Sequence, residues 1–275
     1  MSDFSKASFE KLKEFIYRKS GISLEVEKHY EKLEKYLVDK YEKDEFENFR
    51  KYFFNLRFED KDGLEFQNLM NSITVNETYF FREKHQFEIL INTILPEIHA
   101  RKPKNEPIRI LSAPCSTGEE PYSIAIYLLE DNTLVNERDF EIVGIDIDSN
   151  VIEKAMQGLY TSRSTHAISN TLKGKYFKKK MGYYELSKDL REVITFKKAN
   201  VFDKEEMRQL GKFDVIFSRN MLIYFDDASR KEVAMMFYDM LTPHGFILLG
   251  HAEYMNRIVS VFHPRKIDHH LIYQK

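Results

Sequence analysis

Four short polar segments of the chain could do chemistry, and the first follows the apolar run at 108–111. It places Cys115 and two adjacent acids, Glu119 and Glu120, around the single glycine Gly118. A phosphate-cradling loop would carry two or three glycines and free N–H groups in place of the acids. The segment therefore disfavours a dinucleotide and favours a ligand with positive charge, of which S-adenosylmethionine is the common example. The alternative is that both acids merely complement the N-terminus of the helix that follows.

The second segment, Gly144 to Ser149, ends the next apolar run and contains two acids. An ionised carboxylate at the end of the second strand of a parallel sheet can accept hydrogen bonds from both hydroxyls of a ribose. We assign this role to Asp146. Asp148 lies beside a predicted helix, and we interpret it as the N-cap of that helix.

The third segment, Ser218 to Phe225, is informative for what it lacks. Enzymes that methylate exocyclic amino groups of bases usually place a short Asn/Asp-Pro-Pro-aromatic stretch at this position, and this chain has none. Cys115 follows Pro114, as in the nucleophile of cytosine-carbon methylation, but it comes after the wrong strand. A small buried thiol is the better interpretation of Cys115. A base nitrogen is therefore not the expected acceptor.

The fourth segment, Asn76 to Arg82, lies at the junction of the two halves of the chain. Polar side chains, three consecutive aromatic residues and an arginine within seven residues are too dense for a simple linker. We predict a binding strap whose aromatic residues belong to an interdomain core. The alternative for its polar part is a helix start that Thr78 caps.

The elements that must position these segments divide the chain into two parts. Apolar residues recur at spacings of three and four up to about residue 75, which predicts a helical domain over 1–75. After Pro107, short apolar runs alternate with helical stretches, as in a parallel sheet flanked by helices. This second domain, 76–275, is interrupted at about 160–195 by a lysine- and tyrosine-rich stretch that we interpret as an inserted β-subdomain. The expected fold class is therefore α/β with edge strands at 262–273.

Composition and charge disfavour several classes of function. Forty-two basic and forty-four acidic side chains give a formal charge of -2, so nothing global favours nucleic acid or an anionic membrane as partner. No apolar run approaches the roughly 18 residues that span a bilayer, and residues 1–14 lack the apolar core of a signal peptide. One cysteine excludes an intrachain disulfide framework, and the histidines near the C-terminus lack metal-ligand spacing. We expect a cytoplasmic protein with no nucleic acid, no membrane insertion and no metal.

The polar segments, taken in order, resemble those of the chemotaxis receptor glutamate methyltransferases, the CheR-type family. The strings that carry the resemblance are Asn76 to Arg82, Cys115 to Tyr122, Gly144 to Asp148 and Phe213 to Phe225. The resemblance covers essentially the whole chain. It implies a Rossmann-like sheet of the S-adenosylmethionine-dependent methyltransferases, with an N-terminal helical domain and an inserted β-subdomain. It also implies S-adenosylmethionine as donor, receptor glutamates as acceptors and a glutamyl methyl ester as product.

The resemblance further implies roles for individual residues. Arg82 falls near the reacting centre, and Tyr224 matches the active-site tyrosine of the family. Where many relatives have Asn-Leu in the adenine pocket, this chain has Asn and Val. The positions that match cofactor contacts of the family are Asn76, Thr78, Arg82, Glu119, Asp146, Asn200, Val201, Arg219 and Asn220.

The chemistry of a glutamate acceptor agrees with these residues. A glutamate has a usual pKa of about 4.3 and is ionised at neutral pH, so it needs no strong base to become a nucleophile. The reaction needs in-line placement at about 3 to 3.5 Å and removal of water from the reacting charges. Our hypothesis is that Arg82 and Tyr224 orient the acceptor carboxylate by hydrogen bonds.

A predicted helix over 26–37 places Lys28, Lys32 and Lys35 in one stripe, opposite its apolar face. In the resembling family the helical domain faces the receptor helices, so we predict that this stripe binds their acidic surface. The alternative is an exposed helix whose alternating charges keep it solvated.

Two other functions remain in competition. One is a regulatory module that senses S-adenosylmethionine or its product without catalysis. It would retain Asp146 and Glu119, whereas only the enzyme requires Arg82 and Tyr224 around an open cleft. The other is a nucleic-acid methyltransferase, which would demand a basic groove.

Overall fold

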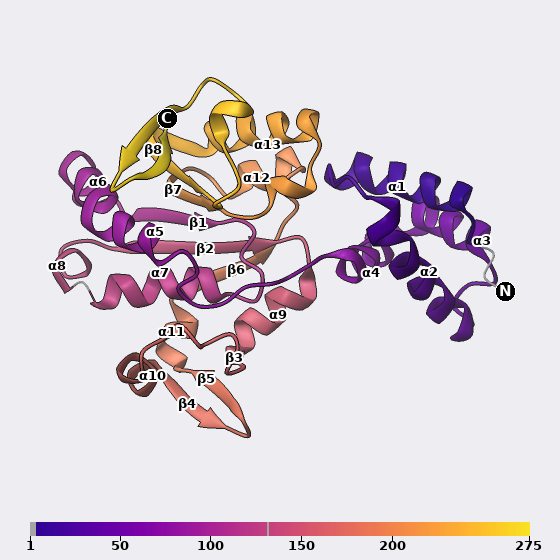
Figure 1. Cartoon of the computed structure of the whole chain (residues 1–275), viewed down its shortest axis with the longest axis horizontal. Helices are drawn as coiled ribbons and strands as arrows, with labels where there is room; N and C mark the ends of the chain where they lie inside the picture. The colour runs from indigo at the N-terminus through magenta and orange to yellow at the C-terminus, as the bar shows by residue number, and fades with distance from the viewer. Residues whose placement is uncertain (1–3, 131) are drawn as a thin grey trace.

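The computed structural model describes residues 4–130 and 132–275, and Figure 1 shows how they are arranged. A helical domain at the N-terminal end lies beside a larger α/β domain, and a small subdomain projects from the latter. None of the helices in these ranges has the length and apolar character that crossing a bilayer requires. We keep 1–75 and 76–275 as proposed domain limits, with residues 1–3 of the first lying outside the described ranges.

The helical domain is built from amphipathic helices packed on one apolar cluster. In α1, Phe9, Leu12 and Ile16 recur at three and four and are buried, while Ser5 caps the first turn by accepting from the Ser8 N–H group. The elements are α1 (Lys6–Ser20), α2 (Val26–Glu42), α3 (Phe49–Phe54), the π-helical turn η1 (Asn55–Glu59) and α4 (Leu64–Ile73).

The α/β domain contains a twisted sheet with the strand order β6-β2-β1-β7-β8-β10-β9. The first five strands are parallel, and β10 pairs antiparallel with both β8 and β9. Apart from the inserted β10, this is the doubly wound order, whose ligand crevice lies where the order reverses, here between β1 and β7. The strands are β1 (Ile108–Ser112), β2 (Phe140–Asp146), β6 (Ile194–Lys198), β7 (Phe213–Ser218), β8 (Leu241–Leu249), β9 (His263–Ile267) and β10 (His270–Gln274).

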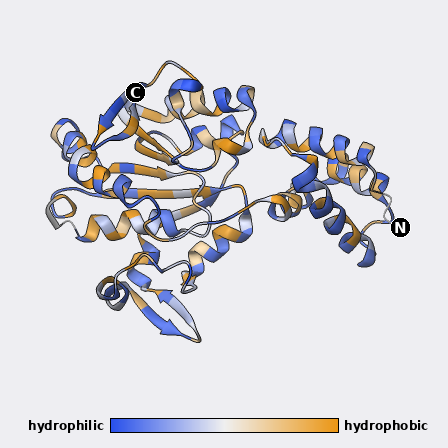
Figure 2. Ribbon diagram, viewed as in Figure 1, coloured by the Kyte–Doolittle hydropathy of each residue, from blue (hydrophilic) through white to orange (hydrophobic). Residues whose placement is uncertain are grey.

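Helices cover both faces of this sheet, so its central strands β1, β2 and β7 are mostly apolar (Figure 2). Successive strand residues serve opposite faces: Ile110 packs with the cluster under α5, α6 and α7, and Leu111 with the cluster under α12 and α13. The helical elements are α5 (Lys84–Ile89), η2 (Leu90–Ile94), α6 (Leu95–Arg101), α7 (Glu119–Glu130), α8 (Asn132–Val135), α9 (Ser149–Gln157), α12 (Lys204–Gln209), η3 (Leu222–Tyr224), α13 (Asp227–Met240) and η4 (Met255–Arg257).

The insertion forms a separate antiparallel sheet with the order β3-β5-β4. Its hairpin is mostly hydrophilic (Figure 2), because Lys178, Lys179 and Lys180 face solvent on β4. Its elements are β3 (Leu159–Tyr160), α10 (Asn170–Tyr176), β4 (Phe177–Lys180), β5 (Tyr183–Leu186) and α11 (Lys188–Glu192).

The aromatic residues of the strap pack inside the α/β domain and not between the two halves. The Phe80 ring lies 4.8 Å from that of Tyr160 and 5.3 Å from that of Phe177, both in the insertion, and Phe81 packs on Tyr127 of α7. The expected interdomain core is therefore wrong in its location. Thr78 caps no helix, because the chain stays non-helical until α5 begins after Glu83.

The two domains meet at a tight turn after α1. Gly21 adopts φ +71°, and a Cβ atom there would lie 2.6 Å from the Phe202 ring. The next residues bind the loop after β7: Ile22 bridges to Phe225, and the Ser23 N–H group donates to the Tyr224 carbonyl at 2.9 Å. The helical domain is thereby fixed against the edge of the sheet where the crevice opens.

We predict that Gly21→Ala destabilises the protein more than Gly63→Ala does. Both glycines have a left-handed backbone, which costs a non-glycine residue about 1–2 kcal/mol, but Gly63 has nothing within 4 Å of its added Cβ. The clash with Phe202 should add roughly 1–3 kcal/mol to the loss for Gly21→Ala. Urea titration gives both free energies of unfolding, and equal losses would show that the turn is not packed against the α/β domain.

Candidate functional site

A cavity of about 270 Å³ opens at the carboxyl ends of β1, β2 and β7. The helical domain closes one side of it with Ser20, Ile22, Leu24 and His29. The other walls come from the strap and from the loops after the three strands and after β6. They include residues 73–79, 82, 114–116, 120, 145–147, 199–201, 219–221 and 223–225.

Asp146 forms the polar floor of this cavity at the end of β2. It is 5% exposed, and each carboxylate oxygen accepts one backbone N–H group, from Ser116 at 2.9 Å and from Asp148 at 3.0 Å. Burial raises the pKa of Asp146 to about 6. Each oxygen keeps a second lone pair, and the buried hydroxyl of Ser116 has no hydrogen-bond partner in the described structure. This unfilled capacity fits the hydroxyls of a ribose.

Asp148 fastens the strap to the sheet. One of its oxygens accepts from the Asn150 N–H group at 2.9 Å, as the predicted N-cap of α9 does. The other accepts from Thr74 Oγ1 at 2.6 Å and from Asn76 Nδ2 at 3.0 Å. One carboxylate thus begins a helix and also holds the strap over the cavity.

Arg82 lies in a constrained turn of the strap. Its two neighbours, Phe81 and Glu83, both have positive φ values, 60° and 55°. The guanidinium donates to the Glu77 carbonyl at 3.0 Å and lies over the Tyr79 ring, and within the described residues it forms no ion pair. Arg82 therefore offers the cavity a cation whose charge is not neutralised by a neighbouring carboxylate.

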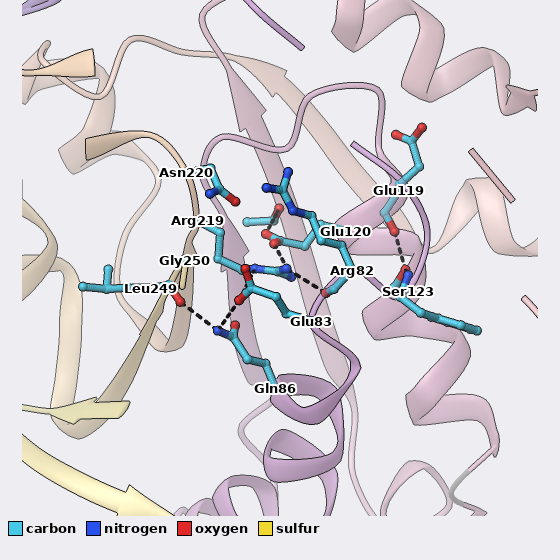
Figure 3. Close-up of polar contacts among 12 residues, drawn as sticks. Arg82, Glu83, Gln86, Glu119, Glu120, Ser123, Arg219, Asn220, Leu249 and Gly250 are labelled. Atoms are coloured by element: carbon cyan, nitrogen blue, oxygen red, sulfur yellow. Dashed lines mark hydrogen bonds and ion pairs between the residues drawn. The ribbon is translucent and has the colours of Figure 1, made fainter. Parts of the chain in front are cut away.

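Arg219, by contrast, is buried and paired. It is 6% exposed, and it binds Glu120 at 3.0 Å and the carbonyl of Arg82 at 2.7 Å (Figure 3). Glu83 stands 3.7 Å from its Nε atom. Glu120 also accepts from the Ser112 hydroxyl at 2.8 Å, and burial raises its pKa. The pair forms a polar wall between the first and third predicted segments.

Glu119 does not line the cavity, and its neighbour Glu120 does. The carboxylate of Glu119 accepts from the hydroxyl of Ser164 in the insertion and from that of Thr117 in the loop after β1, and burial raises its pKa. Adjacent residues of a helix point about 100° apart, so only one of the two acids can face the cavity. The structure thus places Glu120, and not the predicted Glu119, at the ligand side.

The loop after β7 carries Asn220 and Tyr224 into the cavity wall. Asn220 has φ +58°, and Tyr224 is 36% exposed. Burial raises the pKa of Tyr224, and the positive charges of Arg82 and Lys28 oppose this rise. Tyr224 therefore stays a neutral hydrogen-bond donor at physiological pH.

Glu253, which sequence reasoning missed, holds this loop in place. It is 7% exposed and accepts the backbone N–H groups of Asn220, Leu222 and Gly250 at 2.8, 2.8 and 2.9 Å. Burial raises its pKa. A signal was present, because Glu253 follows the buried run at 246–249 and so lies at the same edge of the sheet as Asp146.

The remaining predicted cofactor residues, Thr78, Asn200 and Val201, also line the cavity. The Asn200 amide is already engaged, because it donates to the Lys19 carbonyl at 2.8 Å and accepts from the Phe202 N–H group. It therefore ties the cavity wall to the helical domain.

The predicted basic stripe is only partly free. All three lysines are exposed, and Lys28 pairs with Glu25 at 2.7 Å. Lys32 donates to the carbonyls of Ile73 and Thr74, at the end of α4, and burial lowers its pKa. None of the three lysines lines the cavity, whereas His29 on the same helix does.

Comparisons with known proteins agree with this geometry. The family model described as "CheR methyltransferase, SAM binding domain" matches residues 76–271. Chemotaxis protein methyltransferase 2 of Vibrio cholerae serotype O1 is 43% identical over 259 residues, covering 94% of this chain and 89% of that protein. The chemotaxis protein methyltransferase of Borreliella burgdorferi is 34% identical over 91% of this chain and 89% of its own length. That of Salmonella typhimurium is 33% identical over 95% and 88%.

These findings place the protein first in a class and then in a family. The sheet order, the cavity at its carboxyl edge and the matching family model define an S-adenosylmethionine-dependent methyltransferase. The chain belongs to the CheR methyltransferase family.

We predict that affinity for S-adenosylhomocysteine falls as the pH drops through about 6. Below its pKa the Asp146 carboxyl is protonated and loses acceptor capacity toward ribose hydroxyls. Between about pH 7.5 and about pH 5 the loss should reach about tenfold. Calorimetry at each pH measures it, and Asp146→Asn should bind more weakly with a flatter profile. A variant that keeps the slope of the wild type would show that another group titrates.

We predict that Glu253→Gln lowers kcat by about tenfold or more, because the amide N–H₂ group would face backbone N–H donors and displace the loop of Asn220 and Tyr224. The matched control is Asp203→Asn, since Asp203 also accepts two backbone N–H groups but is exposed and lies outside the cavity. The control should keep its kcat. Equal kcat values for the two variants and the wild type would remove Glu253 from the site.

Proposed function

We propose that this protein methylates the side-chain carboxylates of glutamates in chemotaxis receptors, in the cytoplasm, and so forms glutamyl methyl esters. One observation carries the proposal beyond the family: Arg82 presents an unpaired cation to a cavity whose other arginine, Arg219, is neutralised by Glu120. A guanidinium with free donors is a natural partner for a carboxylate. The names of the relatives, all chemotaxis protein methyltransferases, support the same acceptor.

Different residues around the cavity would bind different parts of the cofactor. S-adenosylmethionine supplies an electrophilic methyl group on a sulfonium. Asp146 and Ser116 would hold the ribose, and Asn200 and Val201 would border the adenine. We assign the methionine end to Glu120, which lines the cavity, in place of Glu119. Asn76, Thr78, Arg219 and Asn220 complete the proposed contacts.

Arg82 and Tyr224 are the proposed catalytic residues. Methylation of a carboxylate forms an oxygen–carbon bond, breaks a carbon–sulfur bond and moves no proton, so the site needs no general base. The two side chains can instead hold the carboxylate in line by hydrogen bonds. The neutral phenol of Tyr224 would orient one oxygen without drawing charge from the nucleophile, and Arg82 would attract the acceptor into the cavity.

The helical domain would contribute to receptor binding through Lys28 and Lys35. Both are exposed, and His29, next to Lys28 on α2, lines the cavity, so this end of α2 lies near it. Lys32 is fastened to the end of α4 and would mainly stabilise the domain. Nothing in the cavity favours the alternative of a module that senses the cofactor without catalysis, since Arg82 and Tyr224 would then be without a task.

The test incubates the protein with radiolabelled S-adenosylmethionine and receptor-rich membranes and measures base-labile methanol. We expect methanol from the wild type and about tenfold or greater loss of kcat in Tyr224→Phe, with affinity for S-adenosylhomocysteine unchanged. Tyr183→Phe is the matched control, because Tyr183 is 49% exposed and lies in the insertion. If base released no radiolabelled methanol from the product, the product would not be a methyl ester and the proposed function would be refuted. If Tyr224→Phe kept the kcat of the wild type, Tyr224 would be excluded from the mechanism.

A further inference from the structure

Two apolar side chains at the cavity mouth are left in solvent. Val75 is 59% exposed and Ile223 is 49% exposed, and both line the cavity. Single exposed apolar residues are common on protein surfaces, but exposed apolar residues that line a cavity can be covered by a ligand that enters it. We call Val75 and Ile223 together the apolar rim.

The fold sets the two members of the apolar rim on opposite sides of the cavity. Val75 lies between Thr74 and Asn76, which both bind Asp148 just after the end of β2. Ile223 lies in η3, which follows β7. Strand β1 runs between β2 and β7 in the sheet, so the cavity floor after β1 lies between the two residues.

The rim is held on both sides by hydrogen bonds that do not involve its own side chains. Asp148 accepts from the side chains of Thr74 and Asn76, the two neighbours of Val75, while Glu253 accepts the N–H group of Leu222, next to Ile223. Such a rim can cover a ligand segment without first being ordered, which lowers the entropic cost of binding.

Charge around the mouth indicates what kind of segment fits. Glu77, an exposed acid of the strap that lines the cavity, is paired with Arg163. Arg82 stands unpaired inside the rim. The arrangement fits a segment that inserts one carboxylate toward Arg82 and presents uncharged residues to Val75 and Ile223, because a charged neighbour would lose its hydration against the apolar rim.

We propose that the apolar rim contacts the residues that border the acceptor glutamate on the receptor and selects glutamates whose neighbours on that face are uncharged. The inference rests on the proposed function and names the specificity determinant of the same site. It assigns Val75 and Ile223 to acceptor recognition and leaves cofactor binding to the residues deeper in the cavity.

The test compares Val75→Ser and Ile223→Ser with Leu64→Ser. Leu64 is the matched control, because it is 68% exposed in the helical domain and does not line the cavity. Methanol release gives kcat and KM for receptor, and calorimetry gives the affinity for S-adenosylhomocysteine. Each rim variant should raise KM for receptor about fivefold, with cofactor-product affinity within about twofold of the wild type. Ile223→Leu should restore KM.

The outcomes separate this inference from the function on which it rests. If the wild type releases no base-labile methanol, the proposed function is refuted, and so is the inference that the apolar rim contacts the acceptor. If the wild type is active and the serine variants match Leu64→Ser in KM, the rim alone is refuted. A loss of cofactor-product affinity as large as the rise in KM would place Val75 and Ile223 in the cofactor site and would also overturn the inference.

Discussion

A carboxylate removed from water must be paired with hydrogen-bond donors or with a cation, and this requirement organises the open edge of the sheet. Each of four acids there, three of them buried and Glu120 partly buried, holds a different piece of chain. Asp146 holds the loop after β1, Asp148 holds the strap and starts α9, and Glu253 holds the loop after β7. Glu120 meets Arg219, which in turn binds the strap through the carbonyl of Arg82. The cavity lies between the segments of chain that these four acids hold.

The same requirement distinguishes Arg219, which has a structural role, from Arg82, which has the proposed functional role. Arg219 is buried and neutralised, so its removal would leave Glu120 unpaired, and its role is to hold the wall together. Arg82 lies on the strap with its charge unmatched in the described structure. A cation preserved in this way is available for a ligand carboxylate, and Tyr224, which lines the same cavity, supplies a neutral donor. The carboxylate of an acidic acceptor can therefore pair with Arg82 and neutralise its charge.

Much of this could be predicted from the sequence. Alternating apolar runs and helical periods predict the α/β sheet, and acids directly after strands predict the floor at Asp146 and the N-cap at Asp148, because both signals are local. Glu119 and Glu120 are adjacent on one helix, and which of them faces the cavity depends on how the insertion docks against α7. That contact spans 45 positions of the chain, so periodicity does not contain it.

Two further differences have the same origin. Lys32 looks like part of a surface stripe, yet its partners at the end of α4 lie 41 and 42 residues away. The aromatic residues of the strap pack on the insertion and on α7, where no spacing pattern would place them. Local pattern therefore identifies which residues are polar anchors or core, and tertiary contacts decide what they hold.

The most direct test of this account is a crystal structure of the protein with S-adenosylhomocysteine. We expect the ribose hydroxyls within hydrogen-bond distance of the Asp146 carboxylate, and the sulfur atom turned toward the space between Arg82 and Tyr224. A ligand bound elsewhere, or one whose sulfur faces away from these two side chains, would contradict the assignment of the cavity.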